Sequence, residues 1–434
     1  MKSTKLILLL VAGLTFAAWA GPAWCQEVAA AQTQADAPSC PACQELEPWH
    51  IPQPCLLQHY GIKMSGWLEQ GISFNGDSPK DRFNGPVACN DLNNEYQMNQ
   101  FWLSLERPVN TGGCGFDIGG RVDTLFGTDW RFGINNGLEN KINGFHGQTY
   151  GTVIPQAYLE VGYNDLTVKA GHMAAILDYE VVPSPANPFY SHSYSYGYCV
   201  PQLVTGVLAD YKLTDQFSVQ AGFHRGWSQF EDNNDKIDFM GGFRWHDPCA
   251  GTTIAYAVSN GPQDPVVPTD TVGQRNRFVY SLVVQQDLCD DLKYVFVHDF
   301  GTEQGASVVT PGAQATWYGI NQYLLYTINK RWSANLRAEW LCDKDGARVA
   351  GPGNIDGVRA WAGRGFAGDF YEVTVGLNWR PHPNFVFRPE LRYDWYSGAP
   401  GYYGPLATPT RGMPFGDGLR TDQFVAACDL IFTF

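Results

Sequence analysis

The chain has 434 residues, of which 43 are acidic and 29 basic, and its formal net charge is −14. This balance excludes nucleic acid as the main partner, because phosphate backbones are bound by basic surfaces. Aromatic residues make up 14% of the chain, charged residues only 17%, and 47 residues are glycine. Such a composition is typical of alternating β-strands that run between two interfacial belts of aromatic side chains.

The N-terminus has the pattern of an export signal. Lys2 and Lys5 form a basic start, residues 6–18 are largely apolar, and Ala18-Trp19-Ala20 has the small-x-small pattern of a cleavage site. We therefore expect residues 1–20 to be a signal peptide, with a cut as late as Cys25 also open. Beyond it, no run approaches the roughly 18 consecutive apolar residues that a membrane-spanning helix requires.

Residues 26–59 are rich in Ala, Gln and Pro and show neither a helix nor a strand period. They are predicted to form a flexible periplasmic N-terminal segment. A metal knuckle is the alternative, because Cys40 and Cys43 form a C-x-x-C half-site near His50 and His59. Since no second C-x-x-C follows at a regular interval, neither a metal nor a cofactor is expected.

From Tyr60 to the end, strand-sized segments with alternating apolar and polar residues follow one another. Tight and long connections alternate between them, and an even number of strands leaves both chain ends on the short-turn side. The pattern predicts that residues 60–434 form an all-β, transmembrane antiparallel barrel with short periplasmic turns and long extracellular loops. We expect about sixteen strands, at 60–74, 95–107, 114–126, 152–163, 165–172, 203–213, 216–226, 236–247, 251–258, 275–287, 291–300, 315–327, 331–341, 370–380, 384–396 and 422–434.

The two faces of these segments differ in chemistry. In 331–341 an apolar row begins and ends with Trp332 and Trp340, whereas Arg337 and Glu339 lie in the opposite row. Since successive strand side chains point to opposite faces, one row would face lipid and the other would line a lumen. By this alternation the predicted wall residues of a pore are Arg121, Arg244, Arg337, Glu339, Arg388 and Arg392.

The third long connection, about 173–202, is the longest and carries Asp178 and Glu180 before a Tyr/Ser/His run over 189–198. The chain resembles sixteen-stranded bacterial porins, and more narrowly the β-barrel porin-2 type, over about residues 60–434. The resemblance is carried by this architecture, by the Gly-containing first strand Tyr60–Trp67 and by the aromatic residue at the end of the chain.

The resemblance implies that the third loop folds into the barrel, narrows it and sets acidic residues against basic wall residues. Carried onto this chain, the loop candidates are Asp178, Glu180, Tyr190, His192, Tyr194 and Tyr196. The tyrosines could offer apolar faces and hydroxyls to a sugar-like solute, or they could pack the loop against the wall. The resemblance also implies that Phe432 and Phe434 belong to the signal read by the barrel-assembly machinery.

An exported chain can oxidise its cysteines, of which there are 11. Because their turns are neighbours, Cys249 and Cys289 are predicted to pair. A second predicted disulfide joins Cys89 in the first loop to Cys199 in the third. Cys428 should stay reduced within the wall.

No nucleophile elbow, zinc-protease motif or nucleotide-binding fingerprint occurs in a sensible context, so no enzyme activity is expected. The expected function is passive diffusion of small hydrophilic solutes or ions across the outer membrane. Alternatives are a sugar- or anion-selective channel, an adhesin or structural protein with a plugged barrel, and a secreted all-β binding module. The expected partners are membrane lipid, the assembly machinery and the solutes, with monomer against homotrimer left open.

Overall fold

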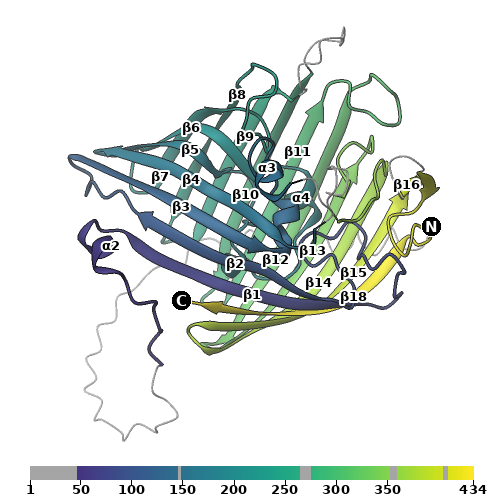
Figure 1. Cartoon of the computed structure of the whole chain (residues 1–434), viewed down its shortest axis with the longest axis horizontal. Helices are drawn as coiled ribbons and strands as arrows, with labels where there is room; N and C mark the ends of the chain where they lie inside the picture. Colours follow the sequence, from purple (N-terminus) through teal and green to yellow (C-terminus); the bar gives the residue numbers. More distant parts are fainter. Residues whose placement is uncertain (1–45, 145–147, 264–274, 352–358, 404–408) are drawn as a thin grey trace, which may run out of the picture. The chain divides into compact units, whose positions relative to one another are not determined.

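The computed structural model describes residues 46–144, 148–263, 275–351, 359–403 and 409–434. Its centre is a closed barrel of sixteen antiparallel strands in which each strand pairs with its neighbour along the chain (Figure 1). The last wall strand pairs with the first and so closes the sheet. The predicted barrel and its strand number are therefore confirmed. The strand bounds are β1 Lys63–Asn75, β2 Tyr96–Arg107, β3 Phe116–Gly127, β4 Gly151–Tyr163, β5 Leu166–Ala174, β6 Leu203–Lys212, β7 Phe217–His224, β8 Asp238–Asp247, β9 Thr252–Pro262, β10 Asn276–Cys289, β11 Leu292–Glu303, β12 Ala315–Asn329, β13 Trp332–Asp343, β14 Gly368–His382, β15 Phe385–Gly398 and β18 Asp422–Thr433.

The closing seam joins β1 to β18, from Trp67 opposite Thr433 to Asn75 opposite Val425. Beyond β18, Phe434 exchanges two backbone hydrogen bonds with Gly66, of 2.9 and 3.0 Å. Closure leaves no unpaired strand edge in the wall, which would otherwise expose a row of backbone donors and acceptors.

Alternation along each strand separates the two faces of the wall. In β18, Val425 and Asp429 are buried inside, whereas Phe424 and Leu430 are exposed on the outside. The outer face carries large apolar side chains on most strands, which water would not favour but hydrocarbon would. The inner face is mostly polar.

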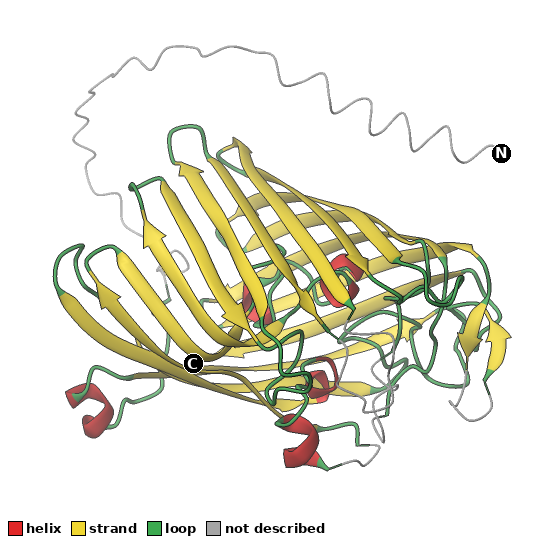
Figure 2. Ribbon diagram, turned by 90° about the horizontal axis from the view of Figure 1, so that it is seen from above, coloured by secondary structure: helices red, strands yellow, loops and turns green. Residues whose placement is uncertain are grey.

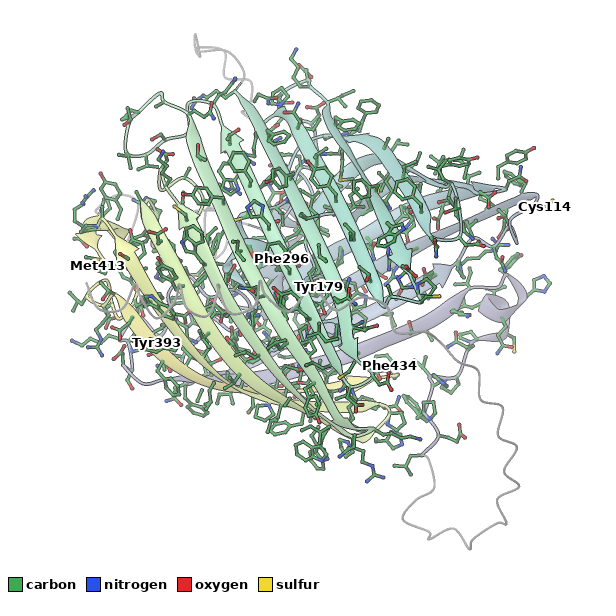
Figure 3. All side chains as sticks on the ribbon, turned by 180° about the vertical axis from the view of Figure 1, so that it is seen from behind. Cys114, Tyr179, Phe296, Tyr393, Met413 and Phe434 are labelled. Atoms are coloured by element: carbon green, nitrogen blue, oxygen red, sulfur yellow. The ribbon has the colours of Figure 1, made fainter. Side chains whose placement is uncertain are left out.

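The two ends of the barrel differ because one carries short turns and the other long loops. Cys114, in a short turn, and Met413, in the last long loop, lie at opposite ends (Figure 3). The last loop contains a two-stranded hairpin, β16 (Gly401–Tyr403) and β17 (Thr410–Gly412), that the sequence did not predict. Strands of three residues are too short to show an alternating pattern. Among the residues described, no helix is long and apolar enough to span a membrane.

In the residues that the structure describes, five short helical turns interrupt the segments that connect or precede the strands (Figure 2). They are α2 Cys55–His59, η2 Thr128–Phe132, α3 Glu139–Asn143, η3 Ser184–Ala186 and α4 Tyr194–Tyr198.

The expected irregular lead-in does not extend through residue 59. Besides α2, the side chain of Gln53 accepts from the backbone of Met64 and donates to its carbonyl, both at 2.7 Å. Asn384 similarly bonds the backbone of Trp49, whose ring stacks on Phe432 at 5.9 Å. These polar side chains imitate strand pairing, which the composition alone did not reveal. The predicted signal peptide at residues 1–20 lies outside the described residues, and so do residues 26–45, which include Cys40 and Cys43.

Candidate functional site

The connection between β5 and β6, here called loop 3 (residues 175–202), contacts strands far from its own anchor points. The backbone N–H of Asp178 donates to Ser281 on β10 at 3.1 Å. The N–H of Ser184 reaches Gln100 on β2 at 3.3 Å. Since β2 and β10 lie far apart around the ring, loop 3 contacts buried side chains of widely separated strands.

Helix α4 explains how loop 3 turns within the barrel. Ser193 caps the helix, because its hydroxyl accepts from the N–H of Tyr196 at 3.2 Å. The carboxylate of Glu339 on β13 accepts the first two N–H groups of the helix, from Tyr194 and Ser195, both at 2.6 Å. The first N–H groups of a helix have no partner within it. A wall acid thus replaces the water that would otherwise bind them.

Arg337 on β13 is the centre of the contact between wall and loop. Its fully buried guanidinium pairs with Glu180 of loop 3 at 2.9 Å and with Glu372 of β14 at 2.5 Å. It also donates to the carbonyl of Ser191 at 2.7 Å and lies over the ring of Phe189 at 5.0 Å. The expected pairing of a wall arginine with a loop acid is present for Glu180.

Arg388 and Arg392 on β15 hold loop 3 by its carbonyl groups. Arg388 pairs with Asp429 at 2.5 Å and donates to the carbonyl of Asn187 at 2.8 Å. Arg392 pairs with Asp394 at 2.8 Å and donates to the carbonyl of His192 at 2.7 Å. In each case a wall acid compensates the arginine, which leaves guanidinium N–H groups for the loop backbone.

The aromatic run of loop 3 is packed rather than open. Tyr190, Tyr194 and Tyr196 are 2%, 1% and 5% exposed. The hydroxyl of Tyr194 donates to Asp394 at 2.6 Å, and that of Tyr190 to Asn99 at 2.9 Å. Tyr196 stacks on His192 at 4.7 Å, and His192 bonds Glu180 at 2.7 Å. This burial fits the packing interpretation of the tyrosines and not an open aromatic slide.

Asp178 does not face an arginine as expected. Its carboxylate accepts the N–H groups of Tyr179 and Glu180 within its own turn. It also interacts electrostatically with Asp299 of β11, which is fully buried. Neither acid forms an ion pair with the residues described. At Asp178 φ is 74°, and in this tight turn the carboxylate meets the N–H groups of the two residues that follow it.

Replacing Asp299 with Asn should stabilise the folded barrel. A buried carboxylate without a cation is costly, and a neutral amide of the same shape removes that cost and the repulsion from Asp178. We expect the thermal midpoint of the detergent-solubilised protein at pH 8 to rise, by an amount equivalent to about 1 kcal/mol. The matched control is Glu372→Gln, which removes a paired acid and should lower the midpoint. A fall in both variants would contradict the uncompensated state of Asp299.

Two predicted wall residues lie away from loop 3. Arg121 pairs on the wall itself, with Asp123 at 2.8 Å and Glu106 at 3.5 Å. Arg244 lies in the inward row of β8 but is exposed near the short-turn end. Among the described residues, neither arginine forms a hydrogen bond or an ion pair with loop 3. Alternation assigns a side chain to a face, but not to a height along the barrel axis.

Sequence reasoning left out the wall acids that complete the network. These acids are Glu69, Glu372, Glu390, Asp394 and Asp429. Four of them share an inward row with an arginine or lie opposite one on the next strand, which is the signal that could have identified them. Glu69 has no such signal, because it lies opposite Ile431 and Gln100 and its partner Arg388 is two strands away.

The two predicted disulfides are absent, since all four cysteines are free thiols. Cys249 lies in the turn between β8 and β9, whereas Cys289 lies at the turn between β10 and β11. The two cysteines therefore belong to different turns. The carbonyl of Cys89 accepts from Gln97 on β2 at 2.9 Å, whereas that of Cys199 accepts from Trp317 on β12 at 3.1 Å. The backbones of the two buried cysteines are thus bound to different strands of the barrel wall, β2 and β12. Cys428 is also a free thiol.

Two cavities flank loop 3. One, of about 350 Å³, lies on the short-turn side and is lined by Tyr179, Asn187 and residues of the β12–β13 turn. The other, of about 250 Å³, lies among the long loops and is lined by Tyr198 and Arg348. Loop 3 contributes residues to the lining of both cavities, which are called the two vestibules below.

Comparisons with known proteins agree with this architecture. The family model described as "Putative beta-barrel porin-2, OmpL-like" matches residues 61–434. No curated protein sequence matches the chain.

Among solved structures, the outer-membrane channel DcaP of Acinetobacter baumannii has a TM-score of 0.53 at 10% identity, covering 86% of this chain and 97% of that one. The anion-selective porin from Comamonas acidovorans has a TM-score of 0.53 at 10% identity, with coverages of 86% and 99%. OprB of Pseudomonas putida has a TM-score of 0.53 at 12% identity, with coverages of 87% and 96%. At these identities the structures show a shared fold. Together with the match of the family model over the whole barrel, they establish that the chain belongs to the OmpL-like β-barrel porin-2 family and is a porin of the outer membrane.

Proposed function

We propose that the protein lets small hydrophilic solutes and ions diffuse passively across the outer membrane, through a lumen that loop 3 narrows. The observation that carries the proposal is the fixed position of loop 3 between two vestibules. Its backbone is held from several strands by buried arginines and acids, so the narrow point keeps its shape as solutes pass. No chemical step is involved.

The same burial favours a second candidate, a structural outer-membrane protein whose barrel is plugged by loop 3. Most side chains at the contact between loop and wall are almost completely buried. A dry contact of this kind could leave no continuous water path.

Conductance separates the two candidates. Purified protein in a planar lipid bilayer should give stepwise currents if it is a pore, because a water-filled lumen conducts ions. Heat-modifiable migration on a denaturing gel verifies that the barrel is folded. Folded protein without current steps would reject the pore and favour the plugged barrel.

We also propose a homotrimer. An apolar groove of about 870 Å³ runs along the wall from β11 to β1, and its lining includes small residues of the outward rows such as Ala334, Ala426 and Cys428. Small residues let two surfaces approach closely. Chemical cross-linking in intact membranes should give a ladder that ends at three copies, and a single uncross-linked band would exclude the trimer.

Removal of Phe434 should impair assembly into the membrane before it changes any pore property. The variant loses the two backbone hydrogen bonds to Gly66 at the seam and the ring contacts with Phe101 and Phe432. Quantification of the heat-modifiable form in outer-membrane fractions checks this, with Phe424→Ala as the control for loss of one outward aromatic ring. Equal amounts of truncated and intact protein would contradict the role of Phe434 as an insertion signal.

A further inference from the structure

The cavity of about 250 Å³ among the long loops has an unusual lining for so acidic a protein. Its walls come from five separate connections and include Arg131, Arg348, Gln202 and Ser228, but neither aspartate nor glutamate. A solute that approaches loop 3 from the long-loop side therefore meets guanidinium groups, although the whole chain has a net charge of −14.

Arg131 is already compensated. Its two terminal nitrogens both pair with the carboxylate of Asp91 at 2.7 Å, and its Nε donates to the carbonyl of Thr128 at 2.9 Å. This arginine shapes the cavity and has little donor capacity left for a ligand.

Arg348 is different. Its Nε donates to the carbonyl of Tyr198 at 2.9 Å, and its guanidinium lies over the rings of Trp227 and Trp317 at 5.0 and 5.1 Å. Within the part of the chain that the structure describes, it forms no ion pair, and the hydrogen bond of its Nε to Tyr198 is the only one that its side chain makes. The two indoles and one backbone carbonyl hold the guanidinium in place while its outer edge stays available.

The neighbouring carboxylates do not pair with the outer edge of the Arg348 guanidinium. Asp343 uses its carboxylate on the backbone N–H groups of residues 347, 348 and 349. Glu303 pairs with Arg277 at 2.8 Å, and the guanidinium of Arg277 lies over the same Trp227 ring at 4.6 Å. Burial and the neighbouring Arg277 lower the pKa of Arg348 to about 10. It therefore remains a cation at neutral pH, and a bound anion would relieve the repulsion.

We propose that this cavity is a binding site for the oxyanion of a small solute, a carboxylate or phosphate, which accepts both terminal N–H groups of Arg348. The planar guanidinium offers two parallel donors that match two oxygens of such a group. Because Trp227 and Trp317 already fix its plane, less side-chain entropy is lost on binding. The inference rests on the proposed pore function in one respect: if the barrel is a pore, the cavity lies at the entrance of the diffusion path.

Binding is measured on the intact, folded protein in detergent by titration with sodium phosphate and, separately, with sodium benzoate, at constant ionic strength. The readout is tryptophan fluorescence, because Trp227 and Trp317 contact the guanidinium. We expect saturable binding of at least one of the two probes. Arg348→Gln should weaken it by about tenfold or more, the effect of losing a charge-assisted pair of hydrogen bonds.

The matched control is Arg364→Gln in the same loop. Arg364 lies over Tyr402 at 5.8 Å and does not line the cavity, so this variant should bind as the unaltered protein does. Arg348→Lys keeps the charge but not the paired donors and should bind with intermediate affinity. If Arg348→Gln does not fold, competition between chloride and the bound probe on the unaltered protein still tests the site. A halide ion has no pair of oxygens to accept the two terminal N–H groups, so chloride should displace the probe only weakly.

Equal affinities of the unaltered protein and Arg348→Gln, or no saturable binding of either probe, would overturn the inference. Conductance is recorded on the same preparations. A conducting protein without binding refutes this site alone, whereas binding without conductance retains the anion site and refutes the pore.

Discussion

Deletion of residues 183–198, with a short Gly–Ser bridge across the gap, is expected to raise single-channel conductance several-fold. The deletion removes η3, the aromatic run and α4, which together occupy the lumen between the two vestibules. Water would replace them, and the current through a pore grows with the area of its narrowest section. The wall charges that now contact the loop would be solvated, so the barrel itself should still form.

A matched deletion of residues 308–311 in the β11–β12 loop provides the control. Val308 and Val309 are 45% and 60% exposed, so their loss should leave the conductance unchanged. Conductance that is the same in the loop-3 deletion and the unaltered protein would show that loop 3 is not the constriction. A silent unaltered protein beside a conducting loop-3 deletion would identify loop 3 as a plug.

Replacement of Arg337 with Met is expected to cause the largest loss of stability of any single substitution at the site. The change leaves Glu180 and Glu372 without their common cation in a buried environment, where the cost of breaking such a pair is about 3–5 kcal/mol. It also removes the hydrogen bonds to Ser191, so loop 3 should detach from β13. A lower thermal midpoint and easier proteolysis within loop 3 would both report this.

Two further variants separate charge from general damage. Arg82→Met breaks a surface pair with Glu95 at 2.8 Å, and such pairs contribute about 0–1 kcal/mol. The double variant Arg337→Met/Glu372→Gln removes one of the two acids that lose Arg337 as a partner and should recover part of the lost stability. A double variant less stable than Arg337→Met alone would mean that Glu372 stabilises the fold independently of Arg337.

The sequence by itself determined the wall. The strand predicted at 331–341 is β13 at Trp332–Asp343, and the final strand predicted at 422–434 is β18 at Asp422–Thr433. Alternation is a local property, since each residue's face follows from that of its neighbour. Because a strand edge cannot stay unpaired in lipid, the last strand was expected to pair with the first, and β18 does pair with β1.

Only the tertiary structure decided which side chains meet inside the wall. Alternation assigned Arg121, Arg244 and Arg337 to the same face, yet only Arg337 reaches loop 3. The height of a side chain along the barrel depends on the register of every preceding strand pair, and the position of loop 3 depends on contacts with strands distant in sequence. For the same reason Asp178 faces Asp299 instead of an arginine, and Cys89 and Cys199 attach to different strands. The periodicity of a chain specifies its faces, whereas the pairing of buried charges is decided when the closed sheet brings distant residues to the same level.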